Sequence, residues 1–269
     1  MINFHRKALV FVFGLGLLSS LPTAQAQTYS ADVPDSVKTP DVVTTERLGT
    51  LKFTDGVPDK QTVKKVYDNL DFSRGVEAFL SGMPAASIYA MCSGFAEAGI
   101  PAHTIGISEK LLDARSLWLT ANSTTVYVTT CLDLKQGPVV MEVAPGILGA
   151  VNDSFFRWVV DIGVTGPDQG RGGRYLFLPP NYDGPVPQVG FHVVRPKTNM
   201  HWVFGRAFVT DGDIKASVAG IKAGMKAYHL SQAKKPPETT VVNFSGKRMN
   251  TIHANDVTFY EELNAVVQN

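Results

Sequence analysis

The stretch from Val151 to Thr210 constrains the fold most, because it contains four runs of strand-forming residues separated by turn formers. In the first run the bulky residues Phe156, Trp158 and Val160 alternate with their neighbours. This period of two is what a half-buried strand requires, since successive side chains leave opposite faces of a sheet. The other three runs are Tyr175–Leu178, His192–Arg195 and Trp202–Val209. With Gly, Pro, Asn and Asp between them, these runs predict antiparallel β-structure.

Helical spacing dominates the chain before this stretch. Apolar residues between Gln61 and Gly99 fall into three amphipathic segments, with Asp59 as a plausible cap. A further helix is predicted near 213–230, with Asp211 or Asp213 as its cap, and further strands at 116–120, 124–132, 139–143 and 240–244. We therefore predict an α+β fold in which N-terminal helices pack on an antiparallel β-sheet or sandwich.

The first residues have the pattern of a secretory signal peptide. Arg6 and Lys7 precede the apolar run Ala8–Leu18, and Ala24-Gln25-Ala26 is a small-residue cleavage site. This pattern predicts a signal peptide over 1–26 and a periplasmic or secreted product. An extended arm is expected over 27–58, the main α+β domain over 59–232, and a linker with a C-terminal helix over 233–269.

Composition narrows the class of protein. The chain has 269 residues, of which 44% are hydrophobic and 18% charged, which is typical of a globular protein. Removing Arg6 and Lys7 with the signal lowers the 25 basic residues to 23, against 24 acidic ones, so the net charge becomes −1. No basic patch favours a nucleic acid, and no apolar stretch after the signal predicts a membrane partner.

The two cysteines, Cys92 and Cys131, allow a disulfide in an exported chain. However, Cys92 lies in an apolar helical segment and Cys131 in an apolar strand. Buried free thiols are therefore the favoured interpretation, and the disulfide is the alternative.

Two familiar kinds of site are disfavoured. The glycine-rich segment from Gly163 to Gly173 lacks the order of a phosphate-binding loop and runs on into a predicted strand, so a strand connection with glycines at positive φ is the better interpretation. No pair of histidines has the spacing of a metal site on one helix. His192 and His201 could meet across strands and are weak metal candidates, but we expect no metal and no cofactor.

Charged residues inside apolar strands are the remaining candidates for chemistry, because a buried charge is costly unless it is paired. Glu142 and Asp161 are the candidate acid–base pair, and Arg157, Arg195 and Arg206 are similarly placed. These residues either form ion pairs that fix strand register or surround a pocket whose ligand the arginines bind. Such a pocket would have flat walls from Tyr127, Trp158 and Trp202.

The run NDSFFRWVVDIGVTGPDQGRGGRYLFLPPNYDG resembles the signature of the family called domain of unknown function 1254. The flanking segments LWLTANSTTVYVTTCLDLKQGPVVMEV and VVRPKTNMHWVFGRAF fit the same family, and the resemblance covers roughly Asp41 to Phe208. Family members often carry Asn-x-Asp-Thr where this chain has Asn122 to Thr125, with Thr124 in place of Asp. Any role of that carboxylate is therefore absent here or moved to another residue. Asn122 is a further ligand-binding candidate.

The resemblance implies a mixed α and β fold with a sandwich-like sheet, and it carries no catalytic assignment. It also implies that a second, β-rich domain, called domain of unknown function 1214, usually follows in family members. The last residues of this chain, HANDVTFYEELNAVVQN, resemble the linker helix that leads into that domain. We predict an exported soluble protein that binds or processes a small polar molecule and that needs a separate partner domain or a homo-oligomer. The alternatives are a hydrolase or lyase with a carboxylate acid–base, and a scaffold or assembly module.

Overall fold

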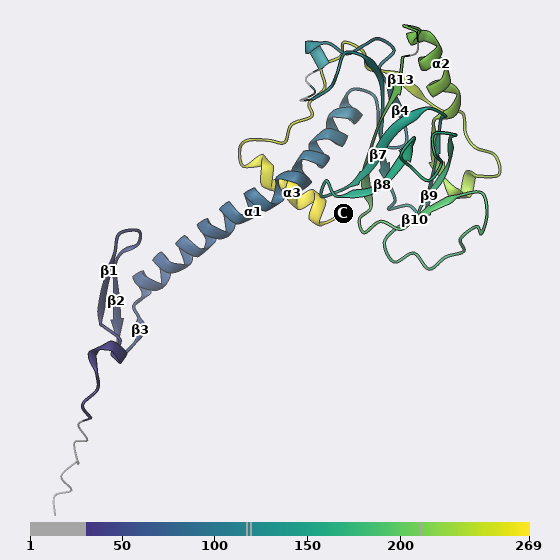
Figure 1. Ribbon diagram of the computed structural model, residues 1–269. Coiled ribbons are helices and arrows are strands. Elements are labelled where there is room, and N and C mark those ends of the chain that lie inside the picture. Colours follow the sequence, from purple (N-terminus) through teal and green to yellow (C-terminus); the bar gives the residue numbers. More distant parts are fainter. Residues whose placement is uncertain (1–30, 117, 119, 210) are drawn as a thin grey trace, which may run out of the picture. The chain divides into compact units, whose positions relative to one another are not determined.

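The computed structural model describes residues 31–269 apart from 117, 119 and 210, and its elements are labelled in Figure 1. The chain forms two compact units, Met1–Tyr67 and Asp68–Asn269. The predicted signal peptide, residues 1–26, lies outside the described residues. In the described part, no helix combines the length and the hydropathy needed to cross a bilayer.

The described part of the first unit contains a small antiparallel sheet where the sequence predicted an extended arm. Its elements are the 3-10 turn η1 (Asp35–Val37) and the strands β1 (Val42–Thr45), β2 (Gly49–Thr54) and β3 (Val57–Pro58), in the order β1-β2-β3. Gly49 and Gly56 have positive φ at the two turns, which glycine adopts without strain. As predicted, Asp59 caps the next helix, because its Oδ1 accepts the Thr62 N–H at 2.6 Å.

One helix of 38 residues, α1 (Lys60–Glu97), replaces the three helices predicted for this region. Pro84 lies inside it, although proline cannot donate the helical hydrogen bond and usually interrupts a helix. The next residues, Ala85, Ala86 and Ile88, are fully buried, so tertiary packing offsets the missing bond. Gly99 follows the helix with φ +89°, as the sequence predicted for its end.

Two sheets form the second unit. The larger has the strand order β13-β4-β5-β11-β7-β8 and the smaller β10-β9-β6-β12. Most neighbours are antiparallel, as predicted, but β13 pairs with β4 and β10 with β9 in parallel. The strands are β4 (Ile105–Ile107), β5 (Thr125–Asp133), β6 (Val139–Val143), β7 (Ile147–Asp153), β8 (Trp158–Gly163), β9 (Gly173–Phe177), β10 (His192–Val194), β11 (Met200–Phe208), β12 (Lys226–His229) and β13 (Val241–Asn243).

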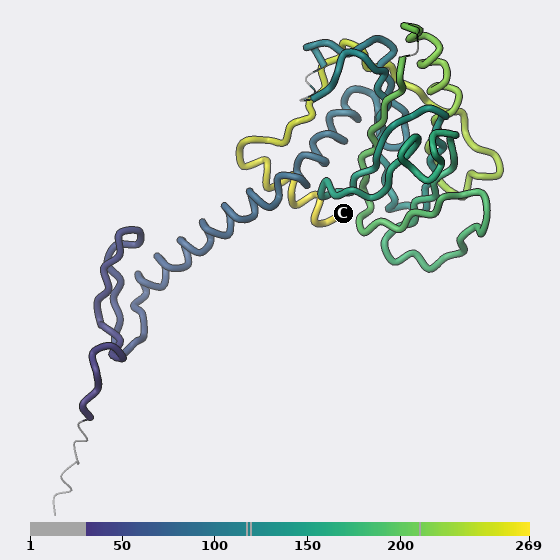
Figure 2. The backbone as a smooth tube through the Cα atoms, viewed as in Figure 1, coloured from purple at the N-terminus to yellow at the C-terminus, as the bar shows by residue number. Residues whose placement is uncertain are grey.

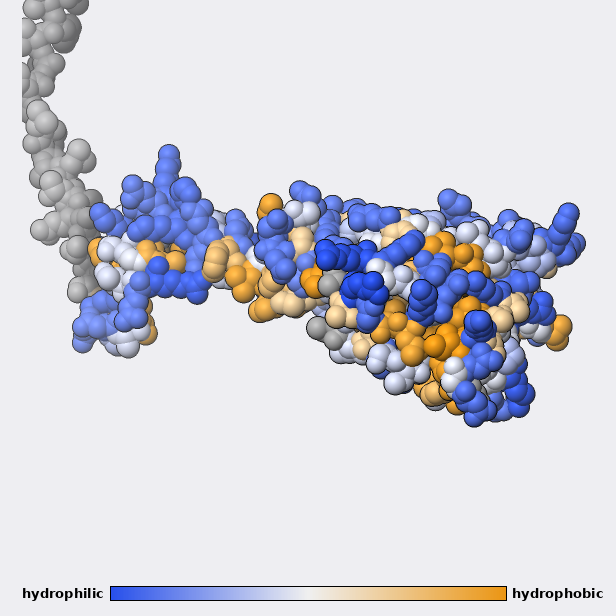
Figure 3. All heavy atoms as spheres, turned by 90° about the horizontal axis from the view of Figure 1, so that it is seen from above, coloured by the Kyte–Doolittle hydropathy of each residue, from blue (hydrophilic) through white to orange (hydrophobic). Residues whose placement is uncertain are grey.

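The two sheets pack face to face, which confirms the predicted α+β sandwich. Their inner faces share one buried core, for example Val128 and Val203 from the large sheet with Met141 and Phe177 from the small one. Helix α2 (Ile214–Gly224) adds Val218 and Ile221 to this core, and Met225, which follows the helix directly, adds a third side chain. Hydrophobic side chains also reach the surface together on the face drawn in Figure 3.

The predicted helix near 213–230 is shorter than expected. Asp213 caps it as predicted, accepting the Ala216 N–H at 3.0 Å, but the helix ends at Gly224. Residues 226–229 then form β12, because they complete the edge of the small sheet opposite β6. The 3-10 turn η3 (Leu230–Gln232) follows.

The end of the chain returns to α1 (Figure 2). Helix α3 (Thr258–Val267) places the Phe259 ring 4.6 Å from that of Phe79. Near the other end of α1, the 3-10 turn η2 (Ala114–Ser116) stands where the sequence predicted the start of a strand.

The glycine-rich segment connects strands, as predicted. Gly163, Gly170 and Gly172 all have positive φ, and β9 follows directly. A single buried carboxylate, that of Asp168, organises the segment: it accepts the N–H of Gly163 at 2.7 Å and that of Gly172 at 3.1 Å.

Candidate functional site

The outer face of the large sheet gathers most of the residues that the sequence singled out. Residues directly opposite on neighbouring strands point to the same side of a sheet, and side chains alternate along each strand. Tyr127 of β5 is opposite Arg206 of β11, and Trp202 of β11 is opposite Asn152 of β7. Asp161 of β8 is opposite Ala150 of β7, and Ala150 is opposite Phe204 of β11. Because Phe204 alternates with Trp202 and Arg206 along β11, Asp161 lies on the same face as these residues. Trp158 joins them, since its Nε1–H donates to Asp161 Oδ1 at 2.8 Å.

An aromatic cluster lines this face. The Phe204 ring lies 5.4 Å from Tyr127, 5.2 Å from Trp202 and 6.0 Å from Trp118. Trp118 also stacks on Phe244, with ring centroids 5.6 Å apart and planes at 13°. These contacts hold the loop before β5 against the sheet. Each aromatic pair stabilises this packing by more than the burial of its apolar area alone.

A cavity of about 390 Å³ lies at the Trp118 end of the cluster. Its walls are Leu112, Asp113, Ala114, Ser116, Trp118, Ala121, Asn122, Ser123 and Thr124. Two polar atoms of these walls, Ser116 Oγ and Trp118 Nε1, are buried without a hydrogen-bond partner among the described residues. Buried polar groups in proteins are nearly always hydrogen-bonded, so both atoms call for an explanation.

Asn122 shapes the floor of the cavity rather than presenting a free amide oxygen. Its Oδ1 accepts the backbone N–H and the hydroxyl of both Thr124 and Thr125, at 2.9 to 3.2 Å. The N–H of Asn122 donates to the Tyr127 hydroxyl at 2.8 Å. Thr124, which stands where family members often have Asp, therefore contributes two donors to this turn, one of which a carboxylate could not supply.

The charge of the walls is neutralised from outside. Among the described wall residues, Asp113 is the only charged one, and the neighbouring Arg115 binds it, with Nε 3.0 Å from Oδ2 and 3.1 Å from Oδ1. These hydrogen bonds from Arg115 lower the pKa of Asp113 below its ordinary value, so the carboxylate stays ionised and paired.

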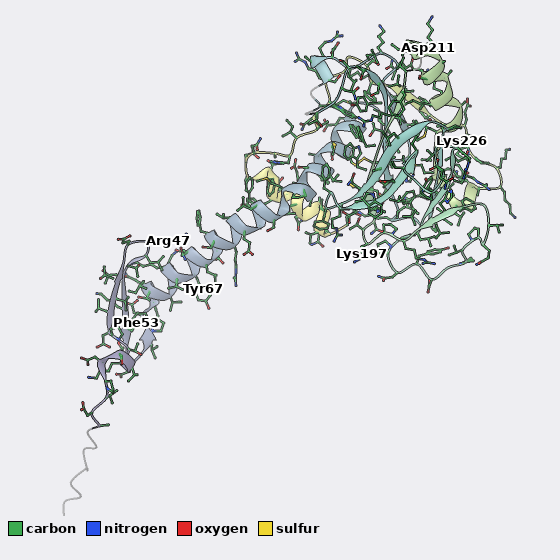
Figure 4. The ribbon with its side chains drawn as sticks, viewed as in Figure 1. Arg47, Phe53, Tyr67, Lys197, Asp211 and Lys226 are labelled. Atoms are coloured by element: carbon green, nitrogen blue, oxygen red, sulfur yellow. A yellow bond between two sulfur atoms is a disulfide. The ribbon has the colours of Figure 1, made fainter. Side chains whose placement is uncertain are left out.

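The two predicted acid–base residues do not come together. Asp161 lies on the large sheet, whereas Glu142 lies on β6 of the small one. There the Tyr228 hydroxyl donates to Glu142 Oε1 at 2.6 Å, and Lys226 Nζ lies 3.9 Å from Oε2 (Lys226 is labelled in Figure 4). Burial, followed by the hydrogen bond to Glu142, raises the pKa of Tyr228. Glu142 therefore sits in a hydrogen-bonded ion pair that fixes β12 against β6.

The other predicted arginines lie elsewhere. Arg157 follows the turn between β7 and β8, where its Nε and Nη2 bind Asp153 Oδ2 at 2.8 and 2.7 Å. Arg195 is exposed just after β10. Neither side chain belongs to the outer face of the large sheet.

The two histidines that were weak metal candidates lie on different sheets. His192 on β10 packs against Tyr175, with ring centroids 5.1 Å apart, while His201 on β11 points into the sandwich core against Phe177. Burial lowers the pKa of His201 to about 4, an effect that the charge of Asp153 partly opposes. Across the described residues, no group of three His, Cys, Asp or Glu side chains is arranged to hold a metal ion.

Cys92 and Cys131 form a disulfide, which corrects our preference for free thiols. The sequence placed both residues correctly, Cys92 on a helix and Cys131 on a strand. It could not show that α1 crosses β5 at this point, which brings the two Cα atoms to 5.9 Å.

Sequence reasoning missed Ser116, Trp118 and Phe204 as parts of the site. Ser116 and Trp118 lie in a segment that was predicted as a strand, and the sequence does not reveal that their polar atoms are buried without a partner. Phe204 was visible only as an apolar residue of a strand. The spacing of Trp202, Phe204 and Arg206 at intervals of two was the signal that could have grouped them.

Residues 103–229 match the family described as "Protein of unknown function (DUF1254)". No curated protein matches the chain. Among solved structures, the crystal structure of the VPA0106 protein from Vibrio parahaemolyticus is similar, with 16% sequence identity and a TM-score of 0.45. The match covers 70% of this chain and 46% of that one, so the chain spans about half the length of that protein.

Proposed function

We propose that the chain, whose residues 103–229 match the family described as a protein of unknown function (DUF1254), binds a small, uncharged polar molecule in the cavity beside Trp118. All nine of the described wall residues fall inside the segment that matches the family. Its volume of about 390 Å³ is in the range of small-molecule sites, which span roughly 300 to 1,000 Å³.

The observation that carries this proposal is the pair of buried polar atoms without partners, Ser116 Oγ and Trp118 Nε1. Leaving a donor unsatisfied costs roughly 1 to 3 kcal/mol. Neither atom is exposed to solvent, so a bound hydrogen-bond acceptor would recover this cost only with a small shift of the wall that turns the donor toward the cavity. An indole N–H can only donate, so the ligand needs an acceptor such as a carbonyl or hydroxyl oxygen.

The electrostatics of the walls favour an uncharged ligand. Arg115 already neutralises Asp113, so among the described wall residues an anion would find no free cation and a cation no free carboxylate. The stacked rings of Trp118 and Phe244 supply a flat apolar surface, which suits a ligand with a planar part.

Benzamide is a suitable probe, because it combines a planar ring with a carbonyl acceptor and an uncharged amide. We expect saturable quenching of tryptophan fluorescence and a rise in Tm on adding benzamide to the full chain. Trp118→Phe, which removes the donor and keeps the ring, should weaken binding about tenfold, and Ser116→Ala should weaken it several-fold.

The matched control is Trp158→Phe, which removes an exposed indole outside the cavity walls. It should bind benzamide like the wild type. Saturable binding that is unchanged in Trp118→Phe, or the lack of saturable binding of benzamide to the folded wild type, would contradict the proposal.

We also propose that the protein is exported. Support comes from the pattern of residues 6–26 and from the Cys92–Cys131 disulfide, because disulfides persist chiefly in oxidising compartments. Mass spectrometry of the protein recovered from a periplasmic extract should find a mature N-terminus at Gln27. Recovery of the uncleaved chain in the cytoplasm would contradict this proposal.

A further inference from the structure

The outer face of the large sheet is covered over one half only. Under α1 and the loop before β5, the β5 residues Tyr127, Thr129 and Cys131 are between 0% and 4% exposed. On β11, β7 and β8 the side chains of the same face are partly exposed rather than buried. We call this part the open half and define it by Trp202, Phe204, Arg206, Leu148, Ala150, Asn152, Trp158 and Asp161. Trp158 is 66% exposed, and Phe156, whose ring contacts Trp202, is 42% exposed.

Two opposite charges stand in the open half without ion-pair partners. Among the described residues, Asp161 has no cationic group within 4.0 Å and Arg206 has no carboxylate within that distance. Both residues are half-buried. The neighbouring Arg157 is different, because Asp153 holds it at 2.7 Å. The indole N–H of Trp158 gives Asp161 one hydrogen bond but no opposite charge, and a partly buried charge gains further when an opposite charge meets it.

The positions of these charges make the open half complementary to itself. Arg206 lies on β11 and Asp161 on β8, on either side of β7. Strand spacing and rise put their Cα atoms about 12 Å apart, across Leu148 and Ala150. A two-fold axis that lies in the plane of the contact and passes over β7 between these two residues would bring Arg206 of one copy opposite Asp161 of the other, twice.

We propose that a second copy of this chain docks on the open half, face to face, with two Arg206–Asp161 ion pairs around an aromatic centre. Trp202, Phe204 and Trp158 supply that centre, and tryptophan and arginine are among the residues that contribute most to protein interfaces. The central Leu148 and Ala150 have small or flexible side chains, which allows two sheet surfaces to approach. A two-fold symmetric dimer uses the same surface patch on both copies, so that patch must be complementary to itself. The open half meets this condition because it carries both charges of the ion pair.

Charge reversal tests the pairing directly. In sedimentation velocity over a wide range of concentrations, the wild-type chain should show a reversible monomer–dimer equilibrium. Asp161→Arg alone and Arg206→Asp alone should each raise the dimer Kd about tenfold to a hundredfold, because each places like charges opposite one another. The double variant, Asp161→Arg with Arg206→Asp, restores opposite charges across the two-fold axis and should return Kd to within a few-fold of the wild type.

The matched control is Lys197→Glu, a charge reversal at an exposed residue on the loop between β10 and β11 (Figure 4). It should leave Kd unchanged. Tm measured for each variant separates loss of dimer from loss of fold. A wild type that stays monomeric at all concentrations, or folded variants in which the double reversal fails to restore the dimer, would overturn the proposal, as would a dimer that is insensitive to all three changes.

Discussion

The hydroxyl of Tyr175 donates a hydrogen bond to Oδ1 of Asp168, and both residues are buried. The same carboxylate accepts the N–H groups of Gly163 and Gly172, so one side chain holds both ends of the glycine-rich segment and the strand that follows it. Burial, with the hydrogen bond to Asp168 second, raises the pKa of Tyr175, which keeps its proton in place as the donor.

Asp168→Asn should lower the free energy of unfolding by about 2 to 3 kcal/mol. Asparagine has one acceptor oxygen for three donors, and its NH₂ group would face another donor. Urea denaturation followed by circular dichroism measures the change. Asp183→Asn, on the exposed loop after β9, is the control and should stay within about 0.5 kcal/mol of the wild type. Equal, small effects at both positions would contradict the structural role of Asp168.

His201 should make stability depend on pH below neutrality. Its pKa in the folded protein is about 4, against roughly 6.5 in an unfolded chain. Between these values the unfolded chain binds a proton that the folded protein does not, so stability falls as pH decreases from 6.5 to 4, by up to roughly 3 kcal/mol.

Replacing His201 by Phe, which suits its position against Phe177, removes this contribution. We expect the difference in unfolding free energy between variant and wild type to grow in favour of the variant as pH falls through this window. Denaturation series at several pH values measure it. Parallel profiles for the two proteins would show that His201 does not titrate as described.

The Cys92–Cys131 disulfide closes a long loop and joins α1 to β5. Loop-closure entropy predicts that it stabilises the fold by about 4 kcal/mol, given the separation of 39 residues. The double variant Cys92→Ala, Cys131→Ala should therefore unfold at lower urea concentration than the oxidised wild type. The wild type reduced with dithiothreitol should resemble the variant, and an oxidised wild type that is no more stable than either would contradict the prediction.

Two glycines of α1 should respond in opposite ways to the same substitution. A Cβ at Gly94 would lie 1.8 Å from the backbone oxygen of Asn250, so Gly94→Ala forces the segment before α3 away from the helix. At Gly75 the nearest neighbour is the Tyr260 hydroxyl, at 3.8 Å from such a Cβ. Gly75→Ala should stabilise the helix by up to about 1 kcal/mol, the usual advantage of alanine.

Gly94→Ala should instead destabilise the protein by several kcal/mol, since backbone atoms must move. Thermal unfolding of both variants side by side measures the contrast. A shift of the same sign and size for both would show that Gly94 is not a point of close approach.

Local patterns predicted several strands, among them β5, β6 and β11, but missed β4, β7 and β12 and gave a strand at 116–120, where the described residues form none. The alternation and the β-branched residues at 139–143 located β6 to the residue, and Asp59 and Asp213 marked helix starts. Pro84 wrongly suggested a break in α1, because the burial that compensates for it depends on contacts distant in sequence.

The candidate site was likewise predicted residue by residue but not as an arrangement in space. Sequence reasoning named Tyr127, Trp202, Arg206 and Asp161 individually, since each is an aromatic or charged residue in a strand. Placing them on one face requires the strand order, in which β11 lies between β5 and β7. The same order separates Glu142 from Asp161, a pairing that composition and spacing alone favoured.

That strand order also governs when the sheet can assemble. β5 and β7 follow each other closely in sequence, yet neither touches the other, because a strand made nearly fifty residues later fills the gap between them. Until residues 200–208 arrive, each early strand has a bare side toward the other, and contacts of such long range form slowly. A chain interrupted before Met200 would therefore hold two unsatisfied β-edges and would be prone to aggregate rather than to fold in part.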